Sequence, residues 1–249
     1  MEKKAKRRLP LAVKIILGLL VVVLLCGGGL FAKMSYEQSI MTPLPTGEVI
    51  PGVYAVNNGF VNSYLVSSGE EYLMVDGGND LGKTESALLQ LGIPAEKVKA
   101  VLLTHSDADH VASLSLFPAA QVYLPALESQ MIDGTTRRSP MGYNHLDREV
   151  TFLEDGQELE ALGKVVRCFA TPGHTPGSMS YLFDGYLFVV DSLSLQEGKA
   201  APFNAFDNMD SEVQKESIKK LAANAQGDYI FAAHYGCTDD PESAFADWR

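Results

Sequence analysis

The chain has 249 residues, enough for one globular domain of about 200 residues and a short leader. Hydrophobic residues make up 46% and charged residues 20% of the sequence, a composition that excludes a disordered or fibrous chain. The net charge is −11, but residues 1–33 hold seven Lys/Arg and one acid, so the remainder carries 13 basic and 30 acidic residues, a net charge of −17. Such a body repels phosphate backbones, which makes nucleic acid a disfavoured partner.

The chain begins with a basic segment and a long apolar run. Met1–Arg8 is basic, and the uncharged stretch Ile15–Ala32 spans 18 residues, about 27 Å as a helix, close to the thickness of a hydrocarbon layer. Residues 1–33 are therefore predicted to be a basic N-terminus and a transmembrane anchor. The positive-inside rule keeps the N-terminus in the cytoplasm and places everything after Lys33 outside it.

A cleavable signal peptide, which would release a secreted protein, is the competing interpretation of this leader. Leu30-Phe31-Ala32 has a bulky residue where a small one is preferred before a cleavage site, and Leu25 is too large for a lipoprotein signal ending at Cys26. An uncleaved anchor is therefore favoured. Residues 34–48, which contain Pro43 and Pro45, are expected to form a linker to a folded domain over residues 49–249.

The first half of this domain is expected to contain strands before helices. Short apolar runs separated by turn sequences predict strands, and a hydrophobic stripe predicts a helix at Thr84–Leu91. The segment His110–Phe117 is predicted to be helical. The predicted strands are Val53–Val56, Val61–Val66, Tyr72–Val75, Val98–Leu103 and Val122–Leu124.

The second half repeats the pattern. Asp184-Gly185 predicts a two-residue hairpin between two strands, and Ser211–Ala225 opens with a capping-box pattern and continues as a helix. Strand clusters that are each followed by helices predict two packed sheets with helices outside, an αββα sandwich. The predicted strands here are Val150–Leu153, Val165–Ala170, Met179–Phe183, Tyr186–Val190 and Tyr229–Ala233.

Potential metal ligands are concentrated directly after the strand that ends at Leu103. The sequence Thr104-His105-Ser106-Asp107-Ala108-Asp109-His110 holds two imidazoles and two carboxylates within six residues. In an extended chain His105, Asp107 and Asp109 point the same way. Burying these groups without partners would be costly, so a structural role does not account for them.

Further potential ligands also follow predicted strands. His174 lies in Thr171-Pro172-Gly173-His174-Thr175-Pro176-Gly177-Ser178, Asp191 ends the run at Val190, and His234 follows the last strand. Four of the five histidines thus lie at strand ends, which can gather at one edge of a sheet. Taken together, these residues predict a metal site.

This pattern resembles the metallo-β-lactamase fold superfamily, whose motif is His-x-His-x-Asp-His followed by a His, a bridging Asp and a final His. The resemblance covers residues from about 50 to 249 and implies an αββα four-layer sandwich. It includes Val75-Asp76-Gly77-Gly78, where Asp76 would order the ligand loop without binding metal. It implies a metal-dependent hydrolase with these metal ligands: His105, Asp107, Asp109, His110, His174, Asp191 and His234.

One residue departs from the motif, because Asp107 stands where the family has its second histidine. By position, one metal would bind His105, Asp107 and His174, and a second would bind Asp109, His110 and His234, with Asp191 bridging. Alternatively, Asp107 does not bind and the first metal site is weak. Two divalent ions are expected, with zinc the first choice and iron or manganese the alternatives, since the additional carboxylate favours harder metals.

The expected reaction is hydrolysis by a hydroxide between the two metals, with Asp109 as the catalytic residue that holds it and moves its proton. A small-molecule ester, thioester or lactone is the favoured substrate, because the Gly-His-Thr-Pro-Gly-Ser segment resembles thioesterases of the superfamily. A phosphodiesterase or nuclease is the first alternative, and a non-catalytic metal-binding protein the second. The sequence indicates no oligomeric state.

Three loops are expected to set specificity: Asn57–Phe60, Met131–Leu146 and Leu193–Met209. The second contains Arg137, Arg138, Tyr143 and His145, which either contact a substrate anion or, as favoured here, are exposed to solvent.

The three cysteines form no CxxC pair, which argues against a thiolate metal site. Free thiols are favoured over a disulfide between Cys168 and Cys237.

Overall fold

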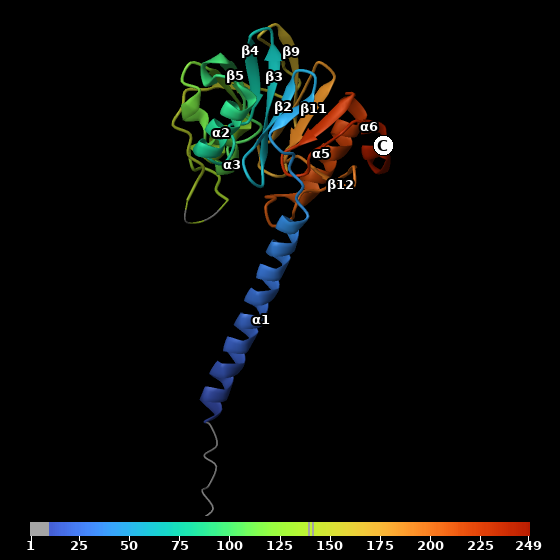
Figure 1. The fold of residues 1–249 in the computed structure, drawn as a ribbon. Coiled ribbons are helices and arrows are strands. Elements are labelled where there is room, and N and C mark those ends of the chain that lie inside the picture. The colour runs from blue at the N-terminus through green and yellow to red at the C-terminus, as the bar shows by residue number, and fades with distance from the viewer. Residues whose placement is uncertain (1–9, 139, 141) are drawn as a thin grey trace, which may run out of the picture. The chain divides into compact units, whose positions relative to one another are not determined.

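The computed structural model describes residues 10–249 except residues 139 and 141 (Figure 1). The basic segment Met1–Arg8 lies outside the described residues. The chain divides into two units, Met1–Met41 and Thr42–Arg249.

The first unit contains one helix, α1, over Leu11–Ser39. Among the described residues it is the one helix long and apolar enough to cross a membrane, with a mean hydropathy of 2.8, a test that a signal sequence also passes. Residues 34–39, which were expected in the linker, continue this helix. The domain boundary at residue 49 stays a prediction.

The first sheet of the second unit has seven strands in chain order. Strands β1 to β4 pair antiparallel and β4 to β7 pair parallel. Their bounds are β1 Gly47–Ile50, β2 Val53–Asn57, β3 Asn62–Ser68, β4 Glu71–Val75, β5 Val98–Leu102, β6 Gln121–Pro125 and β7 Thr151–Leu153.

The second sheet has six strands in the order β15-β14-β11-β10-β9-β8, and a separate hairpin pairs β12 with β13. The predicted hairpin at Asp184-Gly185 is confirmed: both residues have positive φ, 53° and 81°, and Phe183 pairs with Tyr186. The bounds are β8 Glu158–Ala161, β9 Lys164–Ala170, β10 Met179–Phe183, β11 Tyr186–Val190, β12 Ser194–Gln196, β13 Lys199–Ala201, β14 Tyr229–Ala232 and β15 Cys237–Thr238.

The main core lies between the two sheets. Tyr64 and Val75 of the first sheet pack in one buried cluster with Tyr181, Phe188 and Phe231 of the second. Alternate residues of the first sheet face outward, where they pack with residues of α2 and of the segment that follows α3. The remaining helices are α2 Leu81–Leu91, α3 Ala108–Val111, α4 Ser129–Ile132, α5 Ser211–Asn224 and α6 Pro241–Ala244, with 3-10 turns at Ala95–Lys97, Leu114–Leu116, Ala126–Glu128 and Ala246–Trp248.

Helix α5 covers the other side of the second unit. Its Ser217 hydroxyl donates to the Pro172 carbonyl, and its Lys220 ammonium donates to the Ala170 carbonyl at the end of β9. Figure 1 shows α2 and α3 beside β4 and β5, and α5 on the opposite side of the strands. The predicted αββα layering is therefore confirmed.

Two predicted helices differ in detail. The segment His110–Phe117 is not one helix, because α3 ends at Val111 and a short 3-10 turn follows at Leu114–Leu116. The cap of α5 is Asp210, one residue before the predicted Ser211, and its carboxylate accepts from two backbone N–H groups of the first turn. Cys168 and Cys237 are free thiols, as favoured from the sequence.

Candidate metal centre

The seven residues predicted as ligands lie together at one edge of the two sheets. The loop after β5 carries four of them, and β9, β11 and β14 are each followed by one more. The imidazoles and Asp191 are buried, with exposed fractions of 3% or less, whereas Asp107 and Asp109 are half-buried. The alignment of strand ends thus assembles residues that are up to 129 positions apart in the sequence.

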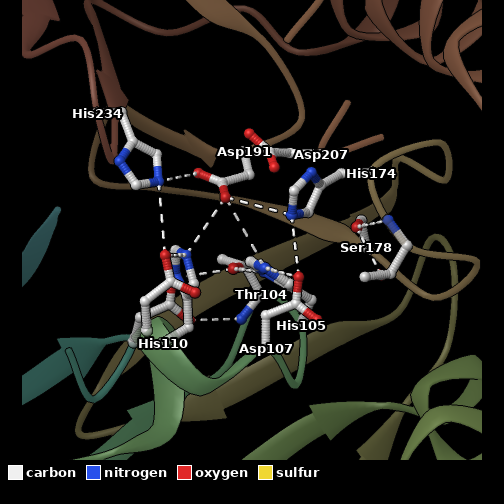
Figure 2. Close-up of polar contacts among 12 residues, drawn as sticks. Thr104, His105, Asp107, His110, His174, Ser178, Asp191, Asp207 and His234 are labelled. Carbon is white, nitrogen blue, oxygen red and sulfur yellow. Dashed lines mark hydrogen bonds and ion pairs between the residues drawn. The ribbon is translucent and has the colours of Figure 1, made fainter. Parts of the chain in front are cut away.

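Asp191 occupies the middle of the cluster (Figure 2). Its Oδ2 lies 3.3 Å from His110 Nε2, 3.4 Å from His174 Nε2 and 3.9 Å from His105 Nε2. Its Oδ1 lies 3.3 Å from His234 Nε2. One carboxylate therefore faces all four imidazoles, with one oxygen directed at three of them and the other at the fourth.

The donor atoms form two groups, each with atoms within 4.8 Å of one another. We call the group around His105 and His174 site 1, and the group of Asp109, His110 and His234 site 2. Asp191 belongs geometrically to site 1 and also faces site 2. Asp107 Oδ2 lies 3.5 Å from His105 Nε2 and 3.2 Å from His174 Nε2, at the side of site 1.

The hydrogen-bond network fixes the tautomers of two of the four imidazoles directly. His110 Nδ1 lies 2.9 Å from the Asp76 carboxylate, and His234 Nδ1 lies 2.7 Å from the Phe60 carbonyl. Since both partners only accept, each Nδ1 carries the proton and donates it. The Nε2 atoms of both residues therefore face the centre.

The other two imidazoles, of His105 and His174, also have an acceptor at Nδ1. Thr104 Oγ1 uses its proton on Asp76, so at 3.0 Å it accepts from His105 Nδ1. The Asn208 amide oxygen, 3.3 Å from His174 Nδ1, also accepts. All four histidines thus direct Nε2 towards the centre, where its lone pair can bind a metal ion in the neutral ring.

Several of these inward atoms lack a hydrogen-bond partner. Among the described residues, His105 Nε2, His110 Nε2 and Asp191 Oδ1 are buried and unpaired. Buried polar atoms are rarely left unsatisfied, and each such atom needs an explanation. Imidazole nitrogens and carboxylate oxygens at this spacing fit divalent metal ions, which would satisfy them.

The electrostatics of the cluster separate acids from bases. Burial would raise the pKa of Asp191, but His234 and His110 hold it well below its usual range. Burial raises and His110 lowers the pKa of Asp109, with a net result of about 2. Burial lowers the pKa of His110, but Asp109 and Asp191 raise it, and the net pKa lies well above the usual value. The carboxylates are therefore anionic and attract cations.

The backbone around the site is held in unusual conformations. Asp76 has φ 60°, and both of its carboxylate oxygens are used: Oδ1 accepts from Thr104 N, while Oδ2 faces Thr104 Oγ1 and His110 Nδ1. The predicted role of Asp76 in ordering the ligand loop is thus confirmed. Val190, directly before Asp191, has φ 49° beside an irregularity in the β11–β14 pairing. Positive φ is a genuine outlier for a β-branched residue, and it turns the chain where Asp191 faces the centre.

Arg138 contacts the site in a way that the sequence interpretation missed. It was expected to be exposed to solvent, and it is in part, but its Nη2 lies 2.5 Å from Asp107 Oδ2 and 3.1 Å from His174 Nε2. Its Nη1 donates to the Asp207 carbonyl. No periodic pattern marks Arg138 in the sequence, because it reaches the site from a loop.

Glu128 and Asn144 were missed altogether. The buried Glu128 carboxylate accepts from Ser106 N, Ser106 Oγ, Thr175 Oγ1 and Gly177 N, so it joins the loops after β5, β6 and β9. Asn144 donates from Nδ2 to both Ser106 Oγ and Asp107 Oδ1. An isolated Glu after a strand gave no signal of this role.

The other residues singled out in the loop at 131–146 are exposed, as expected. The guanidinium of Arg137 lies 5.5 Å from the ring centroid of Tyr143. His145 and Tyr143 line a cavity of about 530 Å³ beside the ligand loop, together with Ser106, Ala108 and Val111.

Aromatic side chains from the two other predicted specificity loops border the centre. Phe60 stacks on His234 with ring centroids 5.6 Å apart, and Phe203 lies 5.2 Å from His174 and 5.4 Å from His234.

A sequence model of the metallo-β-lactamase superfamily matches residues 56–234, which include all seven predicted ligands. The chain belongs to the metallo-β-lactamase superfamily. The fold expected from the resemblance is therefore the fold of this superfamily.

Relatives within the superfamily include "Uncharacterized protein YobT" of Bacillus subtilis, 32% identical over 66% of this chain and 79% of that protein. A hydroxyacylglutathione hydrolase of Aeromonas hydrophila is 30% identical over 73% of this chain and 63% of that enzyme. "Probable polyketide biosynthesis zinc-dependent hydrolase BaeB" of Bacillus velezensis is 34% identical over 52% and 54%. The chain thus spans less than two thirds of the length of the last two.

Among solved structures, a metallo-β-lactamase family protein of Thermus thermophilus matches with a TM-score of 0.62 and 22% identity, over 80% of this chain and 79% of that one. At this identity the likeness shows the fold.

Proposed function

We propose that the chain is a metal-dependent hydrolase of carbonyl compounds, with a thioester or ester as its substrate. The observation that carries this proposal is the set of four inward Nε2 atoms around the Asp191 carboxylate, whose two oxygens face ligands of both sites. Superfamily membership supports hydrolysis, and the hydroxyacylglutathione hydrolase relative supports a thioester.

The proposed ligands are the seven predicted residues. His105, His174 and Asp107 would hold one ion, and Asp109, His110 and His234 the other, with Asp191 shared. Bound metals would lower the pKa of a water and polarise the scissile carbonyl. Zinc is the proposed metal, with iron or manganese as alternatives; the name of the BaeB relative supports zinc.

The protein's own groups supply orientation and proton transfer. Asp109 Oδ2 lies 3.5 Å from His110 Nε2 and is half-buried, so it faces both the centre and the solvent. We assign it to hold the attacking water and to take its proton. Asp76 and Thr104 keep His110 and His105 in the tautomer that the site needs.

The surroundings favour an apolar acyl or thiol group beside the reacting carbonyl. Phe60 and Phe203 form aromatic walls, and the cavity at Ala108 and Val111 adjoins the ligand loop. The net charge of −17 beyond residue 33 would repel a polyanionic phosphodiester. This repulsion favours a thioesterase over a nuclease.

The test uses the full chain in detergent, loaded with Zn²⁺ and offered an S-acyl thioester, a p-nitrophenyl ester, a lactone and bis(p-nitrophenyl) phosphate. We expect thioester or ester hydrolysis with a clear excess of kcat/KM over the phosphodiester. Asp191→Asn should lose metal, measured by mass spectrometry, and activity together.

Three outcomes would contradict parts of the proposal. Hydrolysis of only the phosphodiester would favour the nuclease alternative. Two bound metals without turnover on any substrate would favour a metal-binding protein. Failure to bind metal would remove the hydrolase altogether.

We further propose that α1 is an uncleaved membrane anchor with the N-terminus in the cytoplasm and the hydrolase outside. Its 29-residue length supports an anchor over a cleaved signal peptide. The basic residues before it support the cytoplasmic position of the N-terminus.

A further inference from the structure

The guanidinium of Arg138 lies against the donor atoms of site 1. Its Nη2 lies 2.5 Å from Asp107 Oδ2 and 3.1 Å from both His174 Nε2 and the His174 carbonyl oxygen. Its Nη1 donates to the Asp207 carbonyl. The side chain is 28% exposed, so it reaches the site from the solvent side.

Arg138 uses the same lone pair that a metal ion would need. His174 Nδ1 faces the Asn208 amide oxygen, so its proton is there and Nε2 holds the lone pair. An N–H of Arg138 directed at Nε2 therefore occupies the position of a metal–nitrogen bond. A guanidinium has five donors and no acceptor, so it cannot adapt by rotating a lone pair towards the metal.

Asp107, the acidic partner of Arg138, is also shared between the guanidinium and site 1. Asp107 Oδ2 faces His105 and His174 on one side and the guanidinium on the other. Its second oxygen, Oδ1, is held by Asn144. Asp107 Oδ2 thus faces both the position of a metal ion in site 1 and the guanidinium of Arg138.

No guanidinium or ammonium lies against the donor atoms of site 2 in the part of the chain that the structure describes. His110 Nε2 is unpaired, and the ion pairs of Asp109 and His234 are with each other, His110 and Asp191. The two sites therefore differ in access to a cation, although their imidazoles are oriented alike.

We infer that Arg138 competes with a divalent metal ion for site 1, so that site 2 fills first and site 1 fills only when the ion displaces the guanidinium from His174 Nε2 and Asp107 Oδ2. This rests on the proposed metal centre and adds an order of occupancy to it. Asp107 then acts as a ligand only in the fully loaded protein, because in the partly loaded protein it is paired with Arg138.

The experiment is a titration of the metal-free full chain in detergent with Zn²⁺ against a chromophoric chelator, and with Co²⁺ followed by its visible absorption. Wild type, Arg138→Gln and Arg137→Gln are compared. Arg137 is the matched control, since it is the neighbouring arginine and its guanidinium lies over Tyr143. Circular dichroism checks that each variant is folded.

We expect wild type to bind one equivalent tightly and a second more weakly. Arg138→Gln should tighten the second equivalent by about tenfold or more, because it removes both a competing donor and a positive charge next to the ion. The first equivalent should change less than the second, because Arg138 contacts donor atoms of site 1. Arg137→Gln should match wild type. Arg138→Lys, which keeps the charge without the planar fork, should fall between, and it replaces Arg138→Gln as the readout if that variant does not fold.

An unchanged or weakened second equivalent in Arg138→Gln would overturn the inference, and weakening would show that the guanidinium supports Asp107 as a ligand. This failure is distinct from failure of the proposed function. If the first equivalent binds and the thioester is hydrolysed, only the competition is wrong. If no variant binds metal, the hydrolase proposal falls as well.

Discussion

The orientation of each imidazole depends on one partner, so single residues outside the ligand set control the centre. Asp76 is the clearest case, because it receives bonds from Thr104 N and Thr104 Oγ1 and from His110 Nδ1 while it lies at positive φ. Such outer partners fix the tautomer and the direction of the metal-binding lone pair.

Asp76→Asn should lower metal affinity at site 2 by about 10–100-fold, because the amide lacks the charge that orients His110 and its NH2 group would face donors. Isothermal titration with Zn²⁺ measures this. Asp80→Asn is the control, since it removes the same charge from an exposed helix cap where Asn serves equally well. Equal affinities in the two variants would show that Asp76 does not act on the site.

At the scale of elements, loops from different strands are joined by buried polar groups. Glu128 follows β6, yet its bonds go to Ser106 after β5 and to Thr175 and Gly177 after β9. The close approach is itself restrictive, because a Cβ at Gly177 would lie 2.4 Å from Glu128 N. Glycine is therefore required where the two loops meet.

Glu128→Gln should lower the free energy of unfolding of the second unit by about 1–3 kcal/mol, because the amide nitrogen would face groups that only or mainly donate. Urea unfolding of the metal-free protein measures the change. The exposed Glu154→Gln controls for the lost charge. A loss in Glu128→Gln no larger than in Glu154→Gln would mean that the joined loops adapt freely.

An ion pair between Asp155 and Lys220 links the end of β9 to α5. Asp155 accepts from Ala170 N and from Lys220 Nζ. Burial raises its pKa, but the bonds from Lys220 and Ala170 lower it to a net value below normal. A carboxyl with a lowered pKa in the folded state stabilises the fold above its unfolded pKa, and this is lost as pH falls through the folded value.

We expect Asp155→Asn to be less stable than wild type at neutral pH, by under about 1 kcal/mol for this mostly exposed pair. The difference should shrink as pH falls below about 4, where the carboxyl of wild type begins to be protonated. Thermal melting of both proteins between pH 7 and pH 3 measures it. A difference that is constant with pH would exclude the ion pair as its source.

At the scale of the whole molecule, strand periodicity predicted the layers of the fold. The ligand motif predicted the seven residues that lie together in the structure. The strands that the sequence did not indicate are short or polar, such as Glu158–Ala161 and Cys237–Thr238, and they exist because a neighbour pairs with them. Arg138, Glu128 and Asn144 act through contacts with residues 22 to 69 positions away along the chain, which no local pattern encodes.

The proposed topology predicts where a C-terminal fusion works. Alkaline phosphatase joined after Arg249 should be active in cells, because that enzyme needs an oxidising compartment for its disulfides. A fluorescent protein that matures only in the cytoplasm should be dark at the same position. The reverse result would place the hydrolase in the cytoplasm.

The convergence of four imidazole nitrogens on one carboxylate also bears on how long the folded chain survives in a cell. A metal ion that binds these groups only in the folded chain stabilises the fold, so metal affinity becomes part of the free energy of folding. A chain short of metal would open more often and present more of itself to proteases. Metal supply would then govern the abundance of this protein, not only its turnover.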